Sequence, residues 1–183
     1  DFNKCKKLKS IQMWSNQLTG GIPEFDSLPH LEEIVLNYNF LSGSIPQMLN
    51  APNFGRIELS HNMLSGNLPT YQNSPKIEII KLGQNILTGI IPEYSHLKNL
   101  QYLELGYNNL SGSLPNLVLP KLKNFFVDYN QISGTIPSFT GIPNDCTVNL
   151  NSNKLEGCFP LTVCSFGLFS ASNNNKLPWK GEQ

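Results

Sequence analysis

Arginine is almost absent from this sequence, since Arg56 is the only one among 183 residues. Charged residues make up 14% of the chain, and 13 basic residues balance 13 acidic ones. A surface of this composition lacks the positive field that attracts nucleic acid or an anionic membrane. We therefore expect no nucleic-acid partner and no membrane contact by this segment.

Long hydrophobic runs are also missing. No stretch of about 18 apolar residues is present, and no basic segment leads into an apolar one near the start. The chain begins at Asp1 rather than at a methionine. We expect a soluble chain that is a mature or trimmed piece of a protein, and the sequence leaves open whether a membrane span or a kinase domain follows Gln183.

The sequence has no pattern typical of a catalytic or metal site. The histidines His30, His61 and His96 fall at unrelated positions, and no Asp or Ser recurs beside them at a spacing that would build a triad or a metal site. We expect them to be solvated surface residues. The carboxylates Glu58 and Glu104 lack a cleft of the kind that acid-base chemistry needs. The sequence thus predicts a protein that is not an enzyme and has no metal and no cofactor.

A repeat of about 23 residues is present instead, and it decides the fold. The segment Asn-x-Leu-x-Gly-x-Ile-Pro recurs with asparagine at Asn16, Asn39, Asn62, Asn85, Asn108, Asn130 and Asn153, in steps of 23, 23, 23, 23, 22 and 23. An eighth, degenerate copy ends at Asn174 and is expected to close the stack. The predicted coils lie at about 8–30, 31–53, 54–76, 77–99, 100–121, 122–144 and 145–165, with a closing coil at 166–183.

Each asparagine follows the pattern Leu-x-x-Leu-x-Leu-x-x-Asn, as in Leu100, Leu103, Leu105 and Asn108. The alternation predicts a short strand with one buried face, and strands of successive coils should pair in parallel about 4.8 Å apart. The amide of each asparagine should bond backbone groups of adjacent coils and form a buried ladder, because unpaired buried amides are costly. We therefore expect one leucine-rich-repeat domain over residues 1–183, an α/β solenoid with a parallel concave sheet.

The opposite side of each coil is expected to be irregular. A glycine and then a proline follow each strand segment, as at Gly89 and Pro92, and a second proline often comes before the next strand. Glycine permits a positive φ, and proline fixes φ and ends an extended run. Short 3-10 turns or irregular segments fit the remaining dozen residues better than α-helices.

The coils resemble the plant-specific class of leucine-rich repeats, whose mark is the added Leu-x-Gly-x-Ile-Pro after the strand. The resemblance covers about Leu8 to Asn174. It implies a secreted or cell-surface module similar to the ectodomain of a receptor-like kinase or receptor-like protein, or to a polygalacturonase inhibitor. Some proteins with this repeat bind ice or cell walls, but the outward columns here are less regular than such a use suggests. The paired cysteines that usually open these families are missing before Leu8.

Residues that point outward from the predicted concave sheet are the candidate binding residues, since side chains alternate along a strand. Several are aromatic or charged, a combination typical of interfaces. The candidates are Trp14, Tyr38, Arg56, Glu58, Lys81, Tyr102, Glu104, Tyr107, Phe126, Asp128 and Tyr129.

Two functional interpretations remain open. In the first, the face binds a peptide, a protein or a wall polysaccharide, with a co-receptor or a secreted wall-degrading enzyme as possible protein partners. In the second, the aromatic residues only stack from coil to coil, and the coils self-associate into an extracellular matrix or fibre. An inhibitor of a wall-degrading enzyme is a further alternative, with acidic residues facing a basic enzyme.

The four cysteines are Cys5, Cys146, Cys158 and Cys164, an even number that permits disulfides outside the cytosol. We expect a bond between Cys158 and Cys164 across one turn of the closing coils, with Cys146 as the rival partner of either. Cys5 stands where other coils have leucine, and we expect it either to be a small buried residue or to be the partner of a group in a missing amino-terminal cap. The sequon at Asn109 is a candidate glycosylation site if the protein is extracellular, as the resemblance implies.

Overall fold

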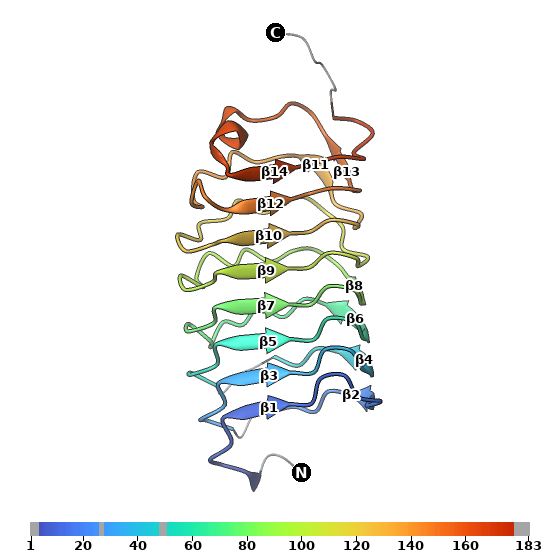
Figure 1. Cartoon of the computed structure of the whole chain (residues 1–183), viewed down its shortest axis with the longest axis vertical. Helices are drawn as coiled ribbons and strands as arrows, with labels where there is room; N and C mark the ends of the chain where they lie inside the picture. Colours follow the sequence, from blue (N-terminus) through green and yellow to red (C-terminus); the bar gives the residue numbers. More distant parts are fainter. Residues whose placement is uncertain (1–3, 26–27, 48–50, 178–183) are drawn as a thin grey trace.

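The computed structural model describes residues 4–25, 28–47 and 51–177, which wind into a stack of coils (Figure 1). Each coil contributes one short strand to an eight-stranded parallel sheet, called the large sheet below. Its strands are, in spatial order, β1 (Ser10–Gln12), β3 (Glu33–Val35), β5 (Arg56–Glu58), β7 (Ile79–Lys81), β9 (Tyr102–Glu104), β10 (Asn124–Phe126), β12 (Thr147–Asn149) and β14 (Leu168–Ser170). The predicted solenoid fold is therefore confirmed.

The register of the large sheet follows the repeat. Ile34 lies opposite Ile57, Ile57 opposite Ile80, and Ile80 opposite Leu103. These central strand residues are fully buried, while their strand neighbours are at the outer face or close to it. A step of 22 or 23 residues therefore places an apolar side chain in the core at each level from β1 to β12, and a last step of 21 places the half-buried Phe169 in β14.

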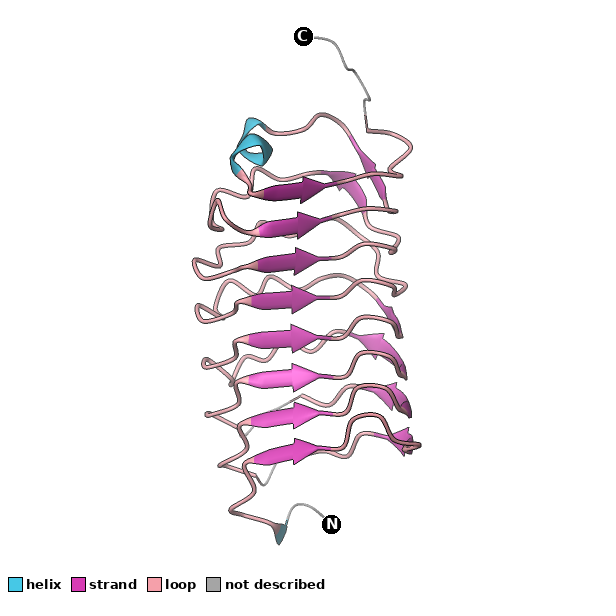
Figure 2. Cartoon of the chain, in the orientation of Figure 1, coloured by secondary structure: helices cyan, strands magenta, loops and turns pink. Residues whose placement is uncertain are grey.

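A second side of the solenoid is also built from strands, which the sequence did not predict. The segments after the first four repeat asparagines form a four-stranded parallel sheet, and those after Asn130 and Asn153 form a further pair nearer the C-terminus (Figure 2). The four strands are β2 (Thr19–Gly21), β4 (Phe40–Ser44), β6 (Met63–Asn67) and β8 (Ile86–Thr88), and the pair is β11 (Ser133–Thr135) with β13 (Lys154–Glu156).

The physical reason lies in the segment Leu-x-Gly-x-Ile itself. Its Leu and Ile are buried, as Leu41 and Ile45 show, and the residues between them face solvent. Adjacent coils present this segment at the same height, so the backbone pairs there as well. The segments after the prolines are loops, as expected.

The asparagine ladder holds neighbouring coils together. The Nδ2 of Asn85 donates to the carbonyl of Leu59 in the preceding coil at 3.0 Å and to that of Leu82 in its own coil at 3.1 Å. Its Oδ1 accepts from the backbone N–H of Leu64 at 2.9 Å. The same bonds recur from Asn39 to Asn174, so backbone groups that the turn leaves without a strand partner are satisfied inside the core.

Asn16 is the exception, since it belongs to the first coil. It is exposed, and its side-chain amide donates only to carbonyls of its own coil, at Met13 and Trp14. Cys5 is exposed as well, which corrects the expectation that it is buried. It precedes β1, and no described coil lies on that side of β1 to cover it.

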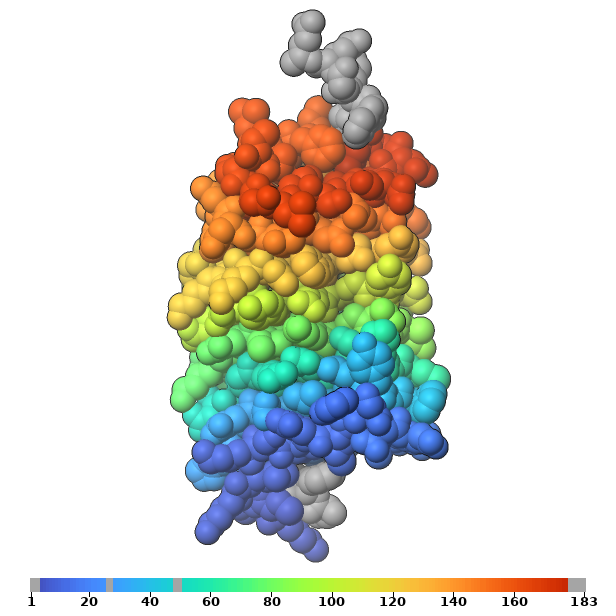
Figure 3. Space-filling view, in the orientation of Figure 1, coloured from blue at the N-terminus to red at the C-terminus, as the bar shows by residue number. Residues whose placement is uncertain are grey.

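The coil before the closing coil ends in the one well-defined 3-10 helix of the part that the structure describes, η2 (Leu161–Ser165). Phe166 and Phe169 lie half-buried against the core, and Asn174 is buried like the ladder residues before it. Figure 3 shows the coils as successive bands from one end of the stack to the other. No helix among residues 4–25, 28–47 and 51–177 is long and apolar enough to cross a membrane.

Candidate functional site

The solvent-facing side of the large sheet, called the outer face below, carries the predicted binding residues. Trp14, Tyr38, Tyr107 and Tyr129 keep between 48% and 59% of their surface exposed, although the core is already complete without them. Tyr102 and Phe126 are half-buried rather than fully outward. The structure thus spreads the aromatic residues over most of the length of the face instead of gathering them at one point.

The residue before each ladder asparagine has a left-handed backbone. Tyr38 has φ 56°, His61 58°, Gln84 55°, Tyr107 58° and Tyr129 51°. This conformation is unfavourable for residues other than glycine, and here it recurs in every coil, including Ser15, Ser152 and Asn173. It turns these side chains out of the strand and lines them up along the stack. No signal in the sequence indicated it, because the residue types at these positions vary.

Aromatic rings in this left-handed column stack on one another. Tyr107 and Tyr129 have ring centroids 4.2 Å apart at an interplanar angle of 14°, and Tyr38 and His61 stack at 4.0 Å and 18°. Each pair covers one face of each ring, so only edges, hydroxyl groups and the outermost faces remain for a ligand. His61 is therefore a half-buried stacking residue, and His96 bonds the carbonyl of Thr70; neither is simply solvated as expected.

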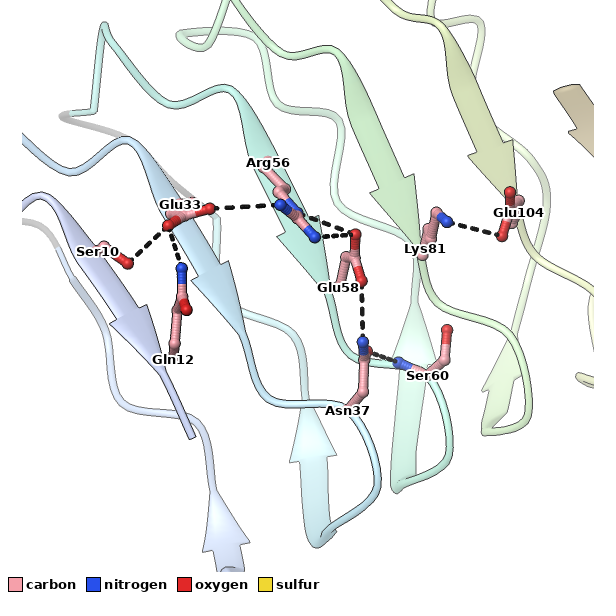
Figure 4. Close-up of polar contacts among 9 residues, drawn as sticks. All are labelled: Ser10, Gln12, Glu33, Asn37, Arg56, Glu58, Ser60, Lys81 and Glu104. Atoms are coloured by element: carbon pink, nitrogen blue, oxygen red, sulfur yellow. Dashed lines mark hydrogen bonds and ion pairs between the residues drawn. The ribbon is translucent and has the colours of Figure 1, made fainter. Parts of the chain in front are cut away.

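A network of polar side chains covers the first strands of the outer face (Figure 4). Glu33 accepts hydrogen bonds from the hydroxyl of Ser10 at 2.7 Å and from the amide of Gln12, and it faces Arg56 at 3.7 Å. These partners, the Ser10 hydroxyl first, lower the pKa of the Glu33 carboxyl below its usual value against the opposing effect of burial. The carboxylate is thus held in its charged form.

The network continues through Glu58, which is only 8% exposed. Arg56 donates to Glu58 Oε1 from Nη2 at 2.8 Å, and Asn37 donates to Oε2 at 2.9 Å. The Oδ1 of Asn37 in turn accepts from the backbone N–H of Ser60. Arg56 and Glu58 were predicted as ligand-binding residues, but in the structure they satisfy each other.

A second cluster lies on the next two strands and consists of Lys81, Glu104 and Tyr102. Lys81 Nζ lies 3.6 Å from Glu104 Oε2 and 5.6 Å from the centroid of the Tyr102 ring. Lys123 lies 5.8 Å from the same ring. Two ammonium groups therefore lie within cation–π distance of the Tyr102 ring, which is half-buried against the sheet.

Asp128 differs from these charged residues. Its side chain is half-buried, and it forms no ion pair within 4.0 Å among the residues that the structure describes. A Cβ built on Gly106 would lie 2.7 Å from Asp128 Oδ1, so the carboxylate extends directly over that glycine. The preceding coil has Gly83 at the same position, where a Cβ would meet the carbonyl of Gly106 at 3.1 Å. Burial raises the pKa of the Asp128 carboxyl, and its own backbone N–H only partly opposes this.

A shallow depression beside the amino-terminal ends of β1, β3, β5 and β7 was not foreseen. It is lined by charged and polar side chains and by Gly55. Lys9 pairs with Glu32 at 2.8 Å and Lys76 with the amide of Asn53 at 2.7 Å, so its charges are largely matched within the protein. In the described part of the chain, no three His, Cys, Asp or Glu residues are grouped to hold a metal ion.

The modification candidates lie away from the outer face. Asn109 is exposed next to the second sheet, where its side chain is accessible. Cys5, Cys146, Cys158 and Cys164 all carry free thiols in the structure, so the Cys158–Cys164 bond is not formed there and stays a prediction. Burial raises the pKa of the Cys146 thiol to about 12.

Comparison with known proteins finds similarity to leucine-rich-repeat proteins. The family model of the Leucine Rich Repeat matches residues 99–119. No curated protein sequence matches the chain. Among solved structures, the plant peptide hormone receptor RGFR1 in complex with RGF2 is similar over 93% of this chain and 30% of its own, at 29% identity and a TM-score of 0.84.

The ectodomain of the Arabidopsis receptor kinase HAESA, in complex with an extended IDA peptide hormone, is 33% identical over 91% of this chain and 29% of its own, with a TM-score of 0.81. A plant ice-binding protein shares the fold at 24% identity, with 98% of this chain and 71% of its own covered and a TM-score of 0.67. The chain spans about 30% of the two receptor structures. This repeat in successive coils, this fold and these likenesses support a leucine-rich-repeat protein of the plant type.

Proposed function

We propose that the chain is part of an extracellular, non-catalytic recognition module that binds a peptide or protein ligand on the outer face. The observation that carries this proposal is the exposure of four large aromatic side chains, Trp14, Tyr38, Tyr107 and Tyr129, on a sheet whose other face completes the core. Aromatic residues with this exposure are typical anchors of protein interfaces.

Two features favour a peptide or protein over a polysaccharide. Sugar rings commonly pack on open aromatic faces, and here the rings of Tyr107 and Tyr129 cover each other. The outer face offers ring edges, hydroxyl groups and charges instead. The structures of RGFR1 and HAESA, which are similar in fold and sequence, each contain a bound peptide hormone.

The test is selection of ligands from a display library of random twelve-residue peptides on the purified chain. Tyr107→Ala and Tyr129→Ala should each weaken the selected peptides by about 2 kcal/mol or more, or about 30-fold, if these residues are anchors. Phe40→Ala is the matched control, because Phe40 is 52% exposed on the second sheet.

Two results would contradict the proposal. One is a library that yields no peptide dependent on the outer face. The other is a set of peptides that lose as much affinity from Phe40→Ala as from Tyr107→Ala.

A further inference from the structure

The other carboxylates among the predicted binding residues and their neighbours on the outer face each pair with a cation. Arg56 pairs with both Glu33 and Glu58, and Lys81 pairs with Glu104. Asp128 has no such partner among the described residues, although its side chain is half-buried. An unpaired carboxylate in that position destabilises the folded chain, because ionisation is opposed by desolvation.

The groups that surround the Asp128 carboxylate lie toward the preceding coil. Its carboxylate extends from the β10 coil back over Gly106 toward the preceding coil. Tyr107 follows Gly106 in the chain, stacks on Tyr129 with one ring face, and keeps 48% of its surface exposed. In the coil before Gly106, the chain has Gly83 at the matching position and the exposed Gln84 after it. An anionic group and an exposed electron-rich ring therefore lie beside two successive positions without side chains.

This arrangement fits a cation. A guanidinium or ammonium group above Gly83 and Gly106 would pair with the carboxylate and lie beside the exposed part of the Tyr107 ring. A planar guanidinium suits both contacts at once, since it accepts bidentate pairing in its plane and stacking on its face. Lys81 is held by Glu104 and the Tyr102 ring, Lys123 lies over the same ring, and neither forms an ion pair with Asp128.

We infer that Asp128 and Tyr107, above Gly83 and Gly106, form a binding site for a basic side chain of the ligand, with arginine preferred over lysine. This inference rests on the proposed function for its ligand class and gives that ligand one required feature. The site explains why this half-buried carboxylate stands unpaired, whereas Glu33, Glu58 and Glu104 each pair with a cation.

The test is a nuclear magnetic resonance titration of the full chain with short capped peptides. The probes are acetyl-Gly-Arg-Gly-amide, the lysine analogue, and the citrulline analogue, which keeps the shape of arginine without its charge. We expect the arginine peptide to shift the amide signals of Gly83, Gly106 and Tyr107, and to bind at least about tenfold more tightly than the citrulline peptide.

Asp128→Asn should reduce the arginine affinity at least about tenfold, to the level of citrulline. The control Glu93→Gln removes one negative charge from an exposed loop residue and should leave the titration unchanged. A second readout separates binding from a structural role. Asp128→Asn should keep or raise the melting temperature at pH 7, because it removes a poorly solvated charge, whereas loss of a structural residue would lower it.

The inference is overturned if arginine and citrulline peptides bind alike, or if Asp128→Asn leaves the arginine affinity unchanged. Either result leaves the proposed function standing when the display library still yields peptides that depend on Tyr129. Absence of such peptides together with an arginine titration that depends on Asp128 would contradict the proposed function and retain the cation site.

Discussion

At the scale of single residues, backbone conformation rather than side-chain contact decides several positions. Gly43 has φ +77° and nothing within 4 Å of a built Cβ, so its role is purely conformational. Gly43→Ala should lower the free energy of unfolding by about 1–2 kcal/mol, because an L-residue is strained there. Gly55→Ala is the matched control, since Gly55 lies outside the positive-φ region and its nearest neighbour would be 3.7 Å away. Equal effects of the two in urea unfolding would refute this account.

A second residue-scale prediction concerns the loss of folding stability at low pH. The folded-state pKa of Glu33 lies below its reference value of 4.5, so its contribution to stability is present above that value and is lost as pH falls through the folded pKa. Glu33→Gln should therefore flatten the loss of stability below about pH 4.5, measured by thermal unfolding across pH. Ser10→Ala, which removes the largest cause of the shift, should flatten it in part. If both variants lose stability at low pH as steeply as the unaltered chain, Glu33 does not contribute to the pH dependence of stability.

At the scale of the repeated element, the ladder asparagine joins one coil to the next. Asn85→Ala should cost about 2–3 kcal/mol, because the buried N–H of Leu64 loses its partner and cannot reach water. Asn16→Ala should cost less than about 1 kcal/mol, since Asn16 is exposed and its side-chain amide bonds only within its own coil. Chemical unfolding of both variants measures the difference. Similar costs would mean that the bonds between coils contribute little.

This element also shows how far sequence reasoning reaches. The large sheet, its register and the buried asparagines follow from the Leu-x-Leu and Asn positions, because alternation and a fixed step determine which side chains meet. The second sheet was missed, since its strands pair only once the coils are already stacked. The pairing of Arg56 with Glu58 was missed for a related reason, because columns predict which residues are neighbours but not which side chains satisfy each other.

The left-handed column is the clearest case of missing information. Tyr107 and Tyr129 were predicted to face outward, and they do. Their mutual stacking depends on a φ angle that neither residue type favours and that the tertiary fold imposes. Asp128 was predicted as a binding residue only by its column, whereas its place over Gly106 is visible only in three dimensions.

At the scale of the whole molecule, the coils have nearly the same length, so one coil can be removed without changing the phase of the repeat. Deletion of residues 77–99 removes β7 and β8 and joins Lys76 to Leu100 in the same phase of the repeat, so β5 can pair with β9. The shortened chain should keep its strand signal in circular dichroism and unfold with a smaller denaturant dependence, because less surface is exposed. Deletion of residues 77–88, half a coil, should abolish cooperative unfolding. Tolerance of both deletions would contradict the stacked-coil account.

Self-association is the whole-molecule alternative to ligand binding. Light scattering across a concentration series should give a constant mass near 20.4 kDa, plus any glycan, if the chain acts as a receptor-type module. Phe159 and Leu161 near the closing end are exposed and are the natural contacts of an end-to-end fibre. Growth of the mass with concentration, reversed by Leu161→Ser, would favour the matrix-forming alternative.

The spacing between strands of the large sheet determines which side chains of a ligand bound along the stack can contact successive coils. Successive coils stand about 4.8 Å apart, whereas side chains on one side of an extended strand recur about every 6.7 Å, so such a ligand falls out of step within two coils. A polyproline II helix advances about 9.3 Å per turn of three residues, close to the 9.6 Å of two coils. A ligand in that conformation would present every third side chain to every second coil, and an extended strand would be read at isolated points only.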